Sequence, residues 1–264
     1  MDFAGVVMKK EESRFADSVL FEGMTSLRAC IRAMDEGIHD RRILRVLYAR
    51  EKAEAKRKEL GWLRAMGTKF GFPLEETDER YLDSVTVGAS HGGIVAECTD
   101  RTIPALASGL LKPDGFYVLI EGIEDPYNFG YAIRSLYACG ADGIVLSPRN
   151  WMSAAGVVCR SSAGASELLP MYTCDGVEAA GIFRGLGYKV CCAGIRDSVS
   201  SFDADLRKPV FLIVGGEKRG ISRALLDTAD VVVRIDYGRE FAGSLSAASA
   251  ASMLGYEVLR QNRG

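Results

Sequence analysis

The stretch Val-Phe-Leu-Ile-Val-Gly-Gly-Glu-Lys-Arg-Gly-Ile-Ser, residues 210–222, decides the fold. It opens with five consecutive apolar residues, a pattern typical of a strand that is buried on both faces of a sheet. The glycines that follow would let the backbone approach a ligand closely. The segment has neither the G-x-G-x-x-G pattern of dinucleotide-binding proteins nor the Lys-Ser/Thr ending of a P-loop. It therefore predicts a ligand loop of another kind, or a tight turn with Ser222 as a helix N-cap.

Four further apolar runs have the same character, at residues 116–120, 143–146, 189–193 and 231–235. Helix-forming segments separate them, and this alternation predicts an α/β domain with a parallel sheet covered on both faces. Ligands of such sheets bind at the carboxyl ends of the strands. The residues that follow each run are therefore the candidates for a functional site.

The run at residues 116–120 is followed by Glu-Gly-Ile-Glu-Asp-Pro-Tyr-Asn-Phe-Gly, residues 121–130, which leads into a helix. Arg134 lies one turn after Gly130, so its side chain would lean back toward the loop and place a cation near the Asn128 amide. In the alternative interpretation, Asn128 caps the helix and Arg134 is an ordinary surface residue. Spacing alone favours this alternative.

The last run is followed by a loop over residues 236–243 and then by Ser-Leu-Ser-Ala-Ala-Ser-Ala-Ala-Ser-Met-Leu-Gly-Tyr, residues 244–256. Alanine and serine dominate this segment, which predicts a helix with little bulk on one face. One interpretation is an Ala-rich helix of high intrinsic propensity. The other is a crowded packing site, either inside a domain or between subunits.

The first part of the chain predicts a separate, smaller α/β unit. Strands are expected at residues 43–48 and 93–98, and Gly37 is a stop signal for the preceding helix. Apolar residues at helical spacing predict that helix, and they are Met24, Leu27, Ile31 and Met34. A turn signal closes residues 105–113. We therefore expect one domain over residues 1–106 and a second over residues 107–264.

Residues 41–64 hold nine basic and three acidic side chains. The acidic residues can pair with lysines along a helix, which would make most of the segment a solvated helix face. Arg41, Arg42 and Arg45 have little acid nearby in the sequence, and an RNA-contacting patch there is an equally good interpretation.

The composition excludes several classes of protein. The chain has 264 residues and a formal net charge of −2, so it is not a uniformly basic protein that coats nucleic acid. Its seven cysteines form no C-x-x-C pair, which favours neither a disulfide framework nor a zinc site. We expect no metal. No signal peptide or membrane span is apparent, so a soluble, cytoplasmic protein is expected.

The ordered set of motifs resembles the SpoU (TrmH-like) family of the SPOUT superfamily of RNA ribose 2′-O-methyltransferases. Residues 124–130 with Arg134 are similar to the first family motif, residues 212–222 with Glu217 to the second, and residues 244–261 to the third. Residues 91–96, which begin His91-Gly92-Gly93, are similar to the substrate-binding domain of the family. This second similarity implies that His91 lies in an RNA-binding domain.

The resemblance implies a SPOUT domain with a deep trefoil knot, a homodimer with shared active sites, and S-adenosylmethionine as cofactor. The catalytic residues implied are Arg134, Asn128, Glu217 and Ser246. The cofactor-binding residues implied by position are Ala193, Gly194, Gly215, Gly216, Ile235, Ser244 and Leu245. Because a guanidinium is a poor general base, we expect Arg134 to hold a phosphate or the developing alkoxide. Asn128 and Glu217 would position the ribose and the loop.

Two departures from the family pattern bear on activity. Ser246 stands where the family usually has asparagine, and Ile235-Asp236-Tyr237 stands where it usually has Ile-Pro-hydrophobic. The leading hypothesis is a methyltransferase acting on ribosomal RNA, with transfer RNA as the alternative substrate. A non-catalytic RNA-binding module of the same fold is a second hypothesis. A nicotinamide-dependent Rossmann enzyme is a third, and the missing G-x-G-x-x-G counts against it.

Overall fold

The computed structural model describes residues 18–87, 91–123, 125–147, 154–216 and 219–263. Its internal contacts divide the chain into two compact units. Unit 1 comprises Met1–Thr102 and Trp151–Leu168, and unit 2 comprises Ile103–Asn150 and Leu169–Gly264. The chain first passes from unit 1 to unit 2 between Thr102 and Ile103, four residues before the boundary expected after residue 106. The return of residues 151–168 to unit 1 differs from the two continuous domains that the sequence predicts.

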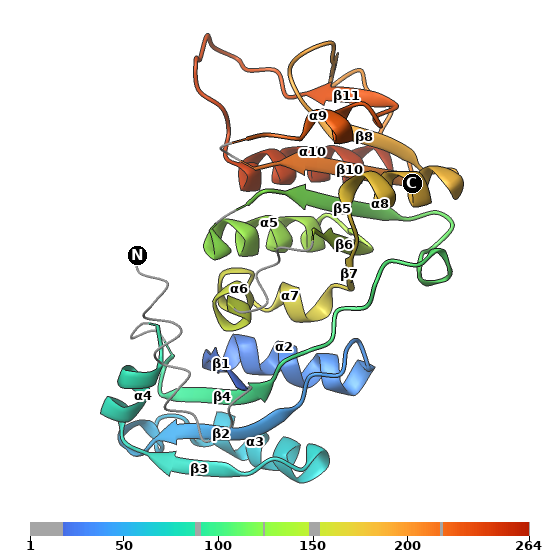
Figure 1. The fold of residues 1–264 in the computed structure, drawn as a ribbon. Coiled ribbons are helices and arrows are strands. Elements are labelled where there is room, and N and C mark those ends of the chain that lie inside the picture. Colours follow the sequence, from blue (N-terminus) through green and yellow to red (C-terminus); the bar gives the residue numbers. More distant parts are fainter. Residues whose placement is uncertain (1–17, 88–90, 124, 148–153, 217–218, 264) are drawn as a thin grey trace. The chain divides into compact units, whose positions relative to one another are not determined.

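Unit 1 is built on a four-stranded sheet with the order β1-β4-β2-β3 (Figure 1). β4 runs antiparallel to both of its neighbours, whereas β3 runs parallel to β2. The strands are β1 (Ser18–Glu22), β2 (Ile43–Ala49), β3 (Leu74–Thr77) and β4 (Ile94–Thr99). The helices are α2 (Gly23–Glu36), α3 (Arg57–Phe70), α4 (Glu79–Val85) and the 3-10 turn η1 (Arg50–Lys52).

The expected elements of unit 1 are present. The predicted helical stripe lies in α2, where Leu27, Ile31 and Met34 are buried. Gly37 ends this helix in the left-handed conformation, with φ 64°, which glycine adopts without a Cβ penalty. The strands expected at residues 43–48 and 93–98 are β2 and β4. The α/β character of the first part of the chain is therefore confirmed.

Two short helices from the middle of the chain, α6 (Ala155–Ser161) and α7 (Ala165–Leu168), complete unit 1. Ala155 and Cys159 belong to the same apolar core as Phe21. The packing is close, because a Cβ added at Gly156 would lie 2.0 Å from the carbonyl oxygen of Leu20. Glycine at this position therefore lets α6 lie directly against the backbone of β1.

A buried charge cluster also joins α7 to the segments that precede β2 and follow β4 in unit 1. The Glu167 carboxylate, 2% exposed, accepts a hydrogen bond of 3.0 Å from Nε of Arg41. The imidazole Nε2 of His39 lies 3.1 Å from the same carboxylate oxygen. Arg101 donates to the carbonyl oxygen of Ser166 over 2.9 Å. Burial would raise the pKa of Glu167, but the hydrogen bond from His39 and the charges of Arg41 and Arg101 lower it to about 2.

Unit 2 contains a seven-stranded sheet with the order β7-β6-β5-β10-β8-β11-β9, and every pairing in it is parallel. This confirms the parallel sheet that the apolar runs predict. The strands are β5 (Phe116–Glu121), β6 (Gly143–Leu146), β7 (Met171–Thr173), β8 (Lys189–Ala193), β9 (Val199–Ser200), β10 (Val210–Gly215) and β11 (Val231–Arg234).

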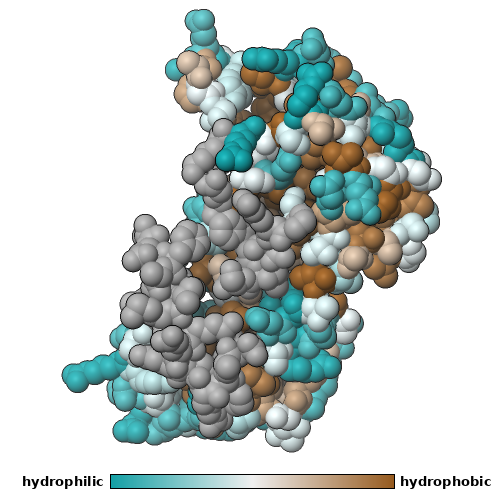
Figure 2. Space-filling model, in the orientation of Figure 1, coloured by the Kyte–Doolittle hydropathy of each residue, from teal (hydrophilic) through white to brown (hydrophobic). Residues whose placement is uncertain are grey.

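The helices of unit 2 include two that pack against its sheet. The helices are α5 (Pro126–Ala138), α8 (Gly176–Gly185), α9 (Arg223–Leu226), α10 (Ala247–Gln261) and the 3-10 turn η2 (Ser108–Leu110). Phe183 of α8 stacks on Phe211 of β10 with ring centroids 4.0 Å apart, at the centre of an apolar core. α10 packs beside α5 and contacts β10. In Figure 2, apolar residues reach the visible surface of unit 2 between hydrophilic ones.

We predict that Glu167→Gln destabilises the protein by about 3 kcal/mol at pH 7, because the substitution leaves buried cations without their counter-charge. The folded pKa of Glu167, about 2, lies below its ordinary value of 4.5. The stabilisation from this carboxylate is therefore present above pH 4.5 and is lost as the pH falls toward 2. Urea unfolding of both proteins at pH 7 and at pH 3 measures the difference.

The matched control is Glu36→Gln, which removes an exposed carboxylate paired with Arg32 over 2.7 Å. An exposed pair of this kind contributes little, so the control should unfold as the unaltered protein does. Equal unfolding free energies for Glu167→Gln and Glu36→Gln would contradict a structural role for the buried cluster.

Candidate functional site

The carboxyl ends of four neighbouring strands form one edge of the sheet in unit 2. Gly215 at the end of β10 is in register with Glu121 at the end of β5, and Ala193 at the end of β8 is in register with Val233 of β11. The chain leaves β5 toward β6 and β7, whereas β8, β9 and β11 lie on the other side of β10. This reversal of strand order marks the place where open α/β sheets bind ligands.

Several predicted cofactor-binding residues lie at this edge, and they are Ala193, Gly194, Gly215, Gly216 and Ile235. Gly194 continues the edge, since its N–H donates to the carbonyl oxygen of Val233 over 2.9 Å. The strand order and the register therefore bring together residues that are distant from one another in the sequence. Glu217, Lys218 and Glu124 lie outside the described residues.

Gly216 brings two loops into direct backbone contact, and Gly215 lets the second of these loops fold back closely on itself. A Cβ at Gly216 would lie 2.1 Å from the carbonyl oxygen of Gly122, and one at Gly215 would lie 2.4 Å from the carbonyl carbon of Gly220. The N–H of Ser222 donates to the Glu121 carboxylate over 2.9 Å. Ser222 is the N-cap residue of α9, although its side chain makes no capping bond. Gly216 is thus required by the contact between the two loops, and Gly215 by the close turn of its own loop.

Helix α5 carries two of the expected catalytic residues. It begins at Pro126, and the carboxylate of Asp125 caps it by accepting from the N–H of Tyr127 over 2.9 Å. Asn128 therefore lies in the first turn and is not the cap. Arg134 is exposed, one turn after the buried Gly130. Six helical positions separate Asn128 from Arg134, so the two side chains leave α5 about 120° apart.

The loop between β11 and α10 borders a cavity of about 420 Å³. Two of the predicted cofactor-binding residues, Ile235 and Leu245, line it. The other five do not, and they are Ala193, Gly194, Gly215, Gly216 and Ser244. The hydroxyl of Tyr237 accepts a hydrogen bond from the N–H of Leu245 over 3.2 Å, which closes the loop on itself. The other lining residues are Asp236, Tyr237, Gly238, Arg239, Phe241 and Met253.

Ser246 has a structural role that the motif comparison does not indicate. It is the N-cap of α10, and its hydroxyl oxygen accepts from the N–H of Ser249 over 3.1 Å. The small residues that follow allow close helix packing, since a Cβ at Gly255 would lie 3.1 Å from Leu136 of α5. This supports the interpretation of a crowded packing site inside the domain.

The structure corrects part of the predicted basic patch. Arg41 is 1% exposed and its guanidinium belongs to the Glu167 cluster. Arg45 is also buried, and it donates to Glu97 over 2.6 Å and to Glu75 over 2.8 Å. The prediction that Arg41 and Arg45 contact RNA is wrong, because both are withdrawn from the surface by acidic partners distant in sequence. Arg42 is exposed, as a contact residue must be.

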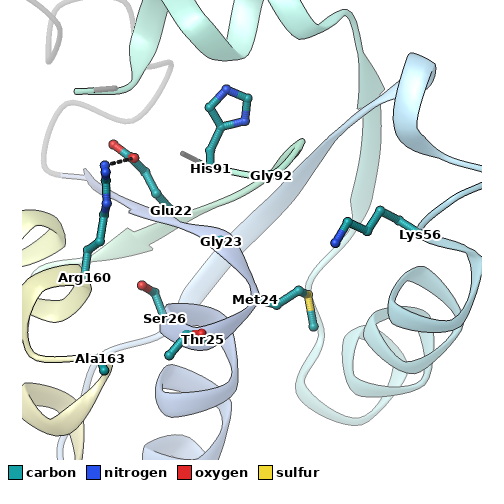
Figure 3. A pocket seen from close by; sticks show the side chains of 10 residues that line it. All are labelled: Glu22, Gly23, Met24, Thr25, Ser26, Lys56, His91, Gly92, Arg160 and Ala163. Atoms are coloured by element: carbon teal, nitrogen blue, oxygen red, sulfur yellow. Dashed lines mark hydrogen bonds and ion pairs between the residues drawn. The ribbon is translucent and has the colours of Figure 1, made fainter. Parts of the chain in front are cut away.

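His91 is buried and supports a turn. Its Nε2 lies 2.9 Å from an oxygen of Asp83, and its Nδ1 accepts from the N–H of Gly93 over 3.0 Å. It also borders a second cavity, of about 290 Å³, which lies within unit 1 at the first turn of α2 (Figure 3). Because His91 is buried, it could affect RNA binding only by shaping this cavity.

The cavity of unit 1 was not indicated by any sequence pattern. Lys56 reaches it from the start of α3, and Arg160 from α6 forms an ion pair of 2.7 Å with Glu22 beside it (Figure 3). The first turn of α2 contains no acidic residue, and no side chain caps it. The cavity is lined by Glu22, Gly23, Met24, Thr25, Ser26, Lys56, His91, Gly92, Arg160 and Ala163.

The part of the chain that the structure describes contains neither a candidate metal site nor a membrane-spanning helix. Within it, no three His, Cys, Asp or Glu side chains are grouped closely enough to hold a metal ion. None of the described helices is both long enough and apolar enough to span a membrane.

Comparison with known proteins identifies the class that this fold and edge define. Residues 115–256 match the model of the SpoU rRNA Methylase family. The chain belongs to this family.

Two individual relatives are similar to about three quarters of this chain. The chain is 30% identical over 202 residues to a 23S rRNA (guanosine-2′-O-)-methyltransferase, RlmB, from Shewanella oneidensis. The aligned region covers 74% of this chain and 80% of the relative. It is 30% identical over 203 residues to an uncharacterised tRNA/rRNA methyltransferase from Mycobacterium ulcerans, which covers 73% of this chain. The chain spans 64% of the length of that mycobacterial protein.

Solved structures share the fold over nearly the whole chain. An rRNA methyltransferase from Sinorhizobium meliloti with AdoMet bound matches with a TM-score of 0.78 at 24% identity, covering 99% of this chain and 93% of that one. The SpoU methyltransferase AviRb from Streptomyces viridochromogenes, in complex with AdoMet, matches with a TM-score of 0.73 at 23% identity, covering 98% and 97%.

Proposed function

We propose that this protein is an S-adenosylmethionine-dependent RNA ribose 2′-O-methyltransferase, with ribosomal RNA as its substrate and the cytoplasm as its location. The observation that carries the proposal is the single sheet edge at which the loops after β5, β8, β10 and β11 meet. The name of the Shewanella relative favours ribosomal RNA over transfer RNA.

The residues at this edge fit the proposed cofactor. A volume of about 420 Å³ lies within the range of small-molecule sites. Ile235, Leu245 and Met253 offer apolar contacts for a purine ring and for the methylene groups of the methionine chain, and Tyr237 adds an aromatic face. The backbone of Gly194 and Gly216 at the neighbouring strand ends can supply polar contacts. When bound there, the cofactor supplies an electrophilic methyl group on a sulfonium sulfur.

The side chains of α5 would orient the RNA. Arg134 is exposed, so its guanidinium can hold a phosphate or stabilise the alkoxide that forms as the ribose hydroxyl loses its proton. A guanidinium stays protonated at neutral pH, so it does not accept that proton readily. We propose that Asn128 and Glu217 position the ribose and the loop. Ser246 serves first as the helix cap, and its hydroxyl keeps one further hydrogen-bonding position.

We propose that unit 2 is a SPOUT domain with a deep trefoil knot and that unit 1 is the substrate-binding domain. Family membership supports the knot. The cavity of unit 1 supports the second assignment, since Lys56 and the uncapped start of α2 offer positive charge to an RNA phosphate, whereas the charge of Arg160 is balanced by Glu22. Exposed Arg42 adds a further cation in this unit.

We also propose a homodimer. α5 and α10, which pack on each other, expose three large apolar side chains, Tyr131, Met253 and Tyr256, each at least half exposed. Met253 lines the cavity as well. A second copy that covered these helices would therefore lie against the proposed active site.

Arg134→Ala is predicted to leave the affinity for S-adenosylmethionine within about two-fold and to lower methyl transfer to RNA by at least about 100-fold, because the interaction it removes is made with the reacting RNA. Calorimetry measures the affinity, and transfer of a radiolabelled methyl group to ribosomal RNA measures activity. The control is Arg223→Ala, which removes an exposed arginine of α9 paired with Asp227.

Loss of cofactor binding in Arg134→Ala would contradict this role. Binding of RNA without methyl transfer by the unaltered protein would favour the non-catalytic RNA-binding module instead.

Replacing both Arg42 and Lys56 by alanine should weaken RNA binding and reduce the slope of log K against log salt by about 1 to 2, roughly one for each phosphate that the variant no longer neutralises. Filter binding to purified ribosomal RNA at several salt concentrations provides the slope. Lys69→Ala is the control, because Lys69 lies in the last turn of α3 and does not line the cavity. Lys69 pairs with Asp35 over 2.5 Å, and Lys56 pairs with Glu59 over 3.5 Å. An unchanged slope in the double variant would remove unit 1's cavity and Arg42 from the RNA interface.

Sedimentation velocity at micromolar concentration is expected to detect a dimer, and Tyr256→Arg is expected to shift it toward monomer by placing a charge in the apolar interface. Leu186→Arg, at an exposed apolar residue at the end of α8, is the control and should leave the dimer intact. A monomeric unaltered protein would rule out an active site shared between copies.

A further inference from the structure

The segment that follows β11 is tied to the edge strand β9 by a closed set of side-chain bonds. One carboxylate oxygen of Asp236 accepts from the hydroxyl of Ser200. The other accepts from Nε of Arg234 over 2.7 Å. Arg234 in turn donates through Nη1 to the carbonyl oxygen of Ser198 over 2.7 Å. We call these four residues the Asp236 network.

The network reinforces a weak part of the sheet. β9 contributes only Val199 and Ser200, and β11 is its partner in the register Val233↔Val199 and Arg234↔Ser200. The N–H of Ser201 donates to the carbonyl oxygen of Arg234 over 2.8 Å. Two residues of pairing leave an edge strand little backbone support, so the side chains decide how firmly the segment after β11 is held.

The network joins two segments that border the proposed cofactor site. The chain leads from Gly194, at the end of β8, directly to Ser198 and Ser200. On the other side, Asp236 lies between Ile235 and Tyr237, and all three line the 420 Å³ cavity. Tyr237 accepts from the N–H of Leu245, so the position of Asp236 also affects the far end of the loop.

We propose that Asp236 is a positioning residue, which holds the segments after β8 and β11 at the spacing that cofactor binding requires. The inference rests on the proposed function. Both carboxylate oxygens are engaged by the protein, and Ser200 is 5% exposed and does not line the cavity. Because the ion pair with Arg234 is partly exposed, it contributes little to global stability. We therefore assign to Asp236 the role of maintaining the geometry of the site.

Four variants test the proposal, and calorimetry with S-adenosylmethionine and thermal unfolding are measured for each. Asp236→Ala and Ser200→Ala should each weaken binding about 10-fold, the range seen when a supporting hydrogen bond to a site is removed. The double variant should lose little more than Asp236→Ala alone, because both changes break the bond between Ser200 and Asp236. Ser200→Ala also removes the acceptor for the N–H of Phe202, a bond of 3.2 Å within the turn that follows β9. Asp236→Asn should recover part of the affinity, since its amide oxygen can still accept from Ser200.

Controls separate positioning from general damage. Ser201→Ala and Asp203→Asn alter neighbouring residues of the same connection and should bind as the unaltered protein does. The unfolding midpoints of all variants should agree within a few degrees. In steady-state assays, KM for the cofactor should rise with little change in kcat.

Two results would overturn the proposal. If Ser200→Ala binds the cofactor normally while Asp236→Ala does not, Asp236 acts by direct contact with the ligand. If affinity falls only in parallel with the unfolding midpoint, the network is merely structural. Failure of the unaltered protein to bind S-adenosylmethionine would instead refute the proposed function, on which this inference depends.

Discussion

The parallel pairing of β10 with β5 on one side and β8 on the other is the constraint on which unit 2 depends. It brings the ends of three strands to one edge, and it forces the loops after β5 and β10 into backbone contact at Gly122 and Gly216. A side chain at Gly216 would separate these loops. The arrangement of the candidate site is therefore set by the sheet first and by the side chains of the loops second.

Much of this arrangement could be predicted from the sequence because parallel strands leave a strong local signal. A strand buried on both faces needs a continuous apolar run, and residues 210–214 and 116–120 have one each. The rule that ligands bind at carboxyl ends then selected the segments after these runs without knowledge of the strand order, and the family resemblance assigned Gly215, Gly216 and Ile235 within them to the cofactor. The order itself depends on contacts between distant segments and has no comparable local signal.

The residues that the sequence placed wrongly are those whose partners are far away in the chain. Arg41 has little acid nearby in sequence, yet it is buried against Glu167, 126 positions later. Arg45 is paired with Glu97, 52 positions later. A local count of charge treats both as surface cations. Asp236 is the opposite case. In the sequence it is only a departure from the family pattern, whereas the structure shows that its carboxylate accepts a hydrogen bond from Ser200.

The return of α6 and α7 to unit 1 means that the chain passes between the two units three times. A fragment that ended at residue 106 would lack the helices that supply Ala155 and Cys159 to the core around Phe21, and its buried Arg41 would have no Glu167. The remaining fragment would carry a carboxylate and apolar helices with no core to enter. Neither unit can therefore be exchanged for another module by a single cut and fusion.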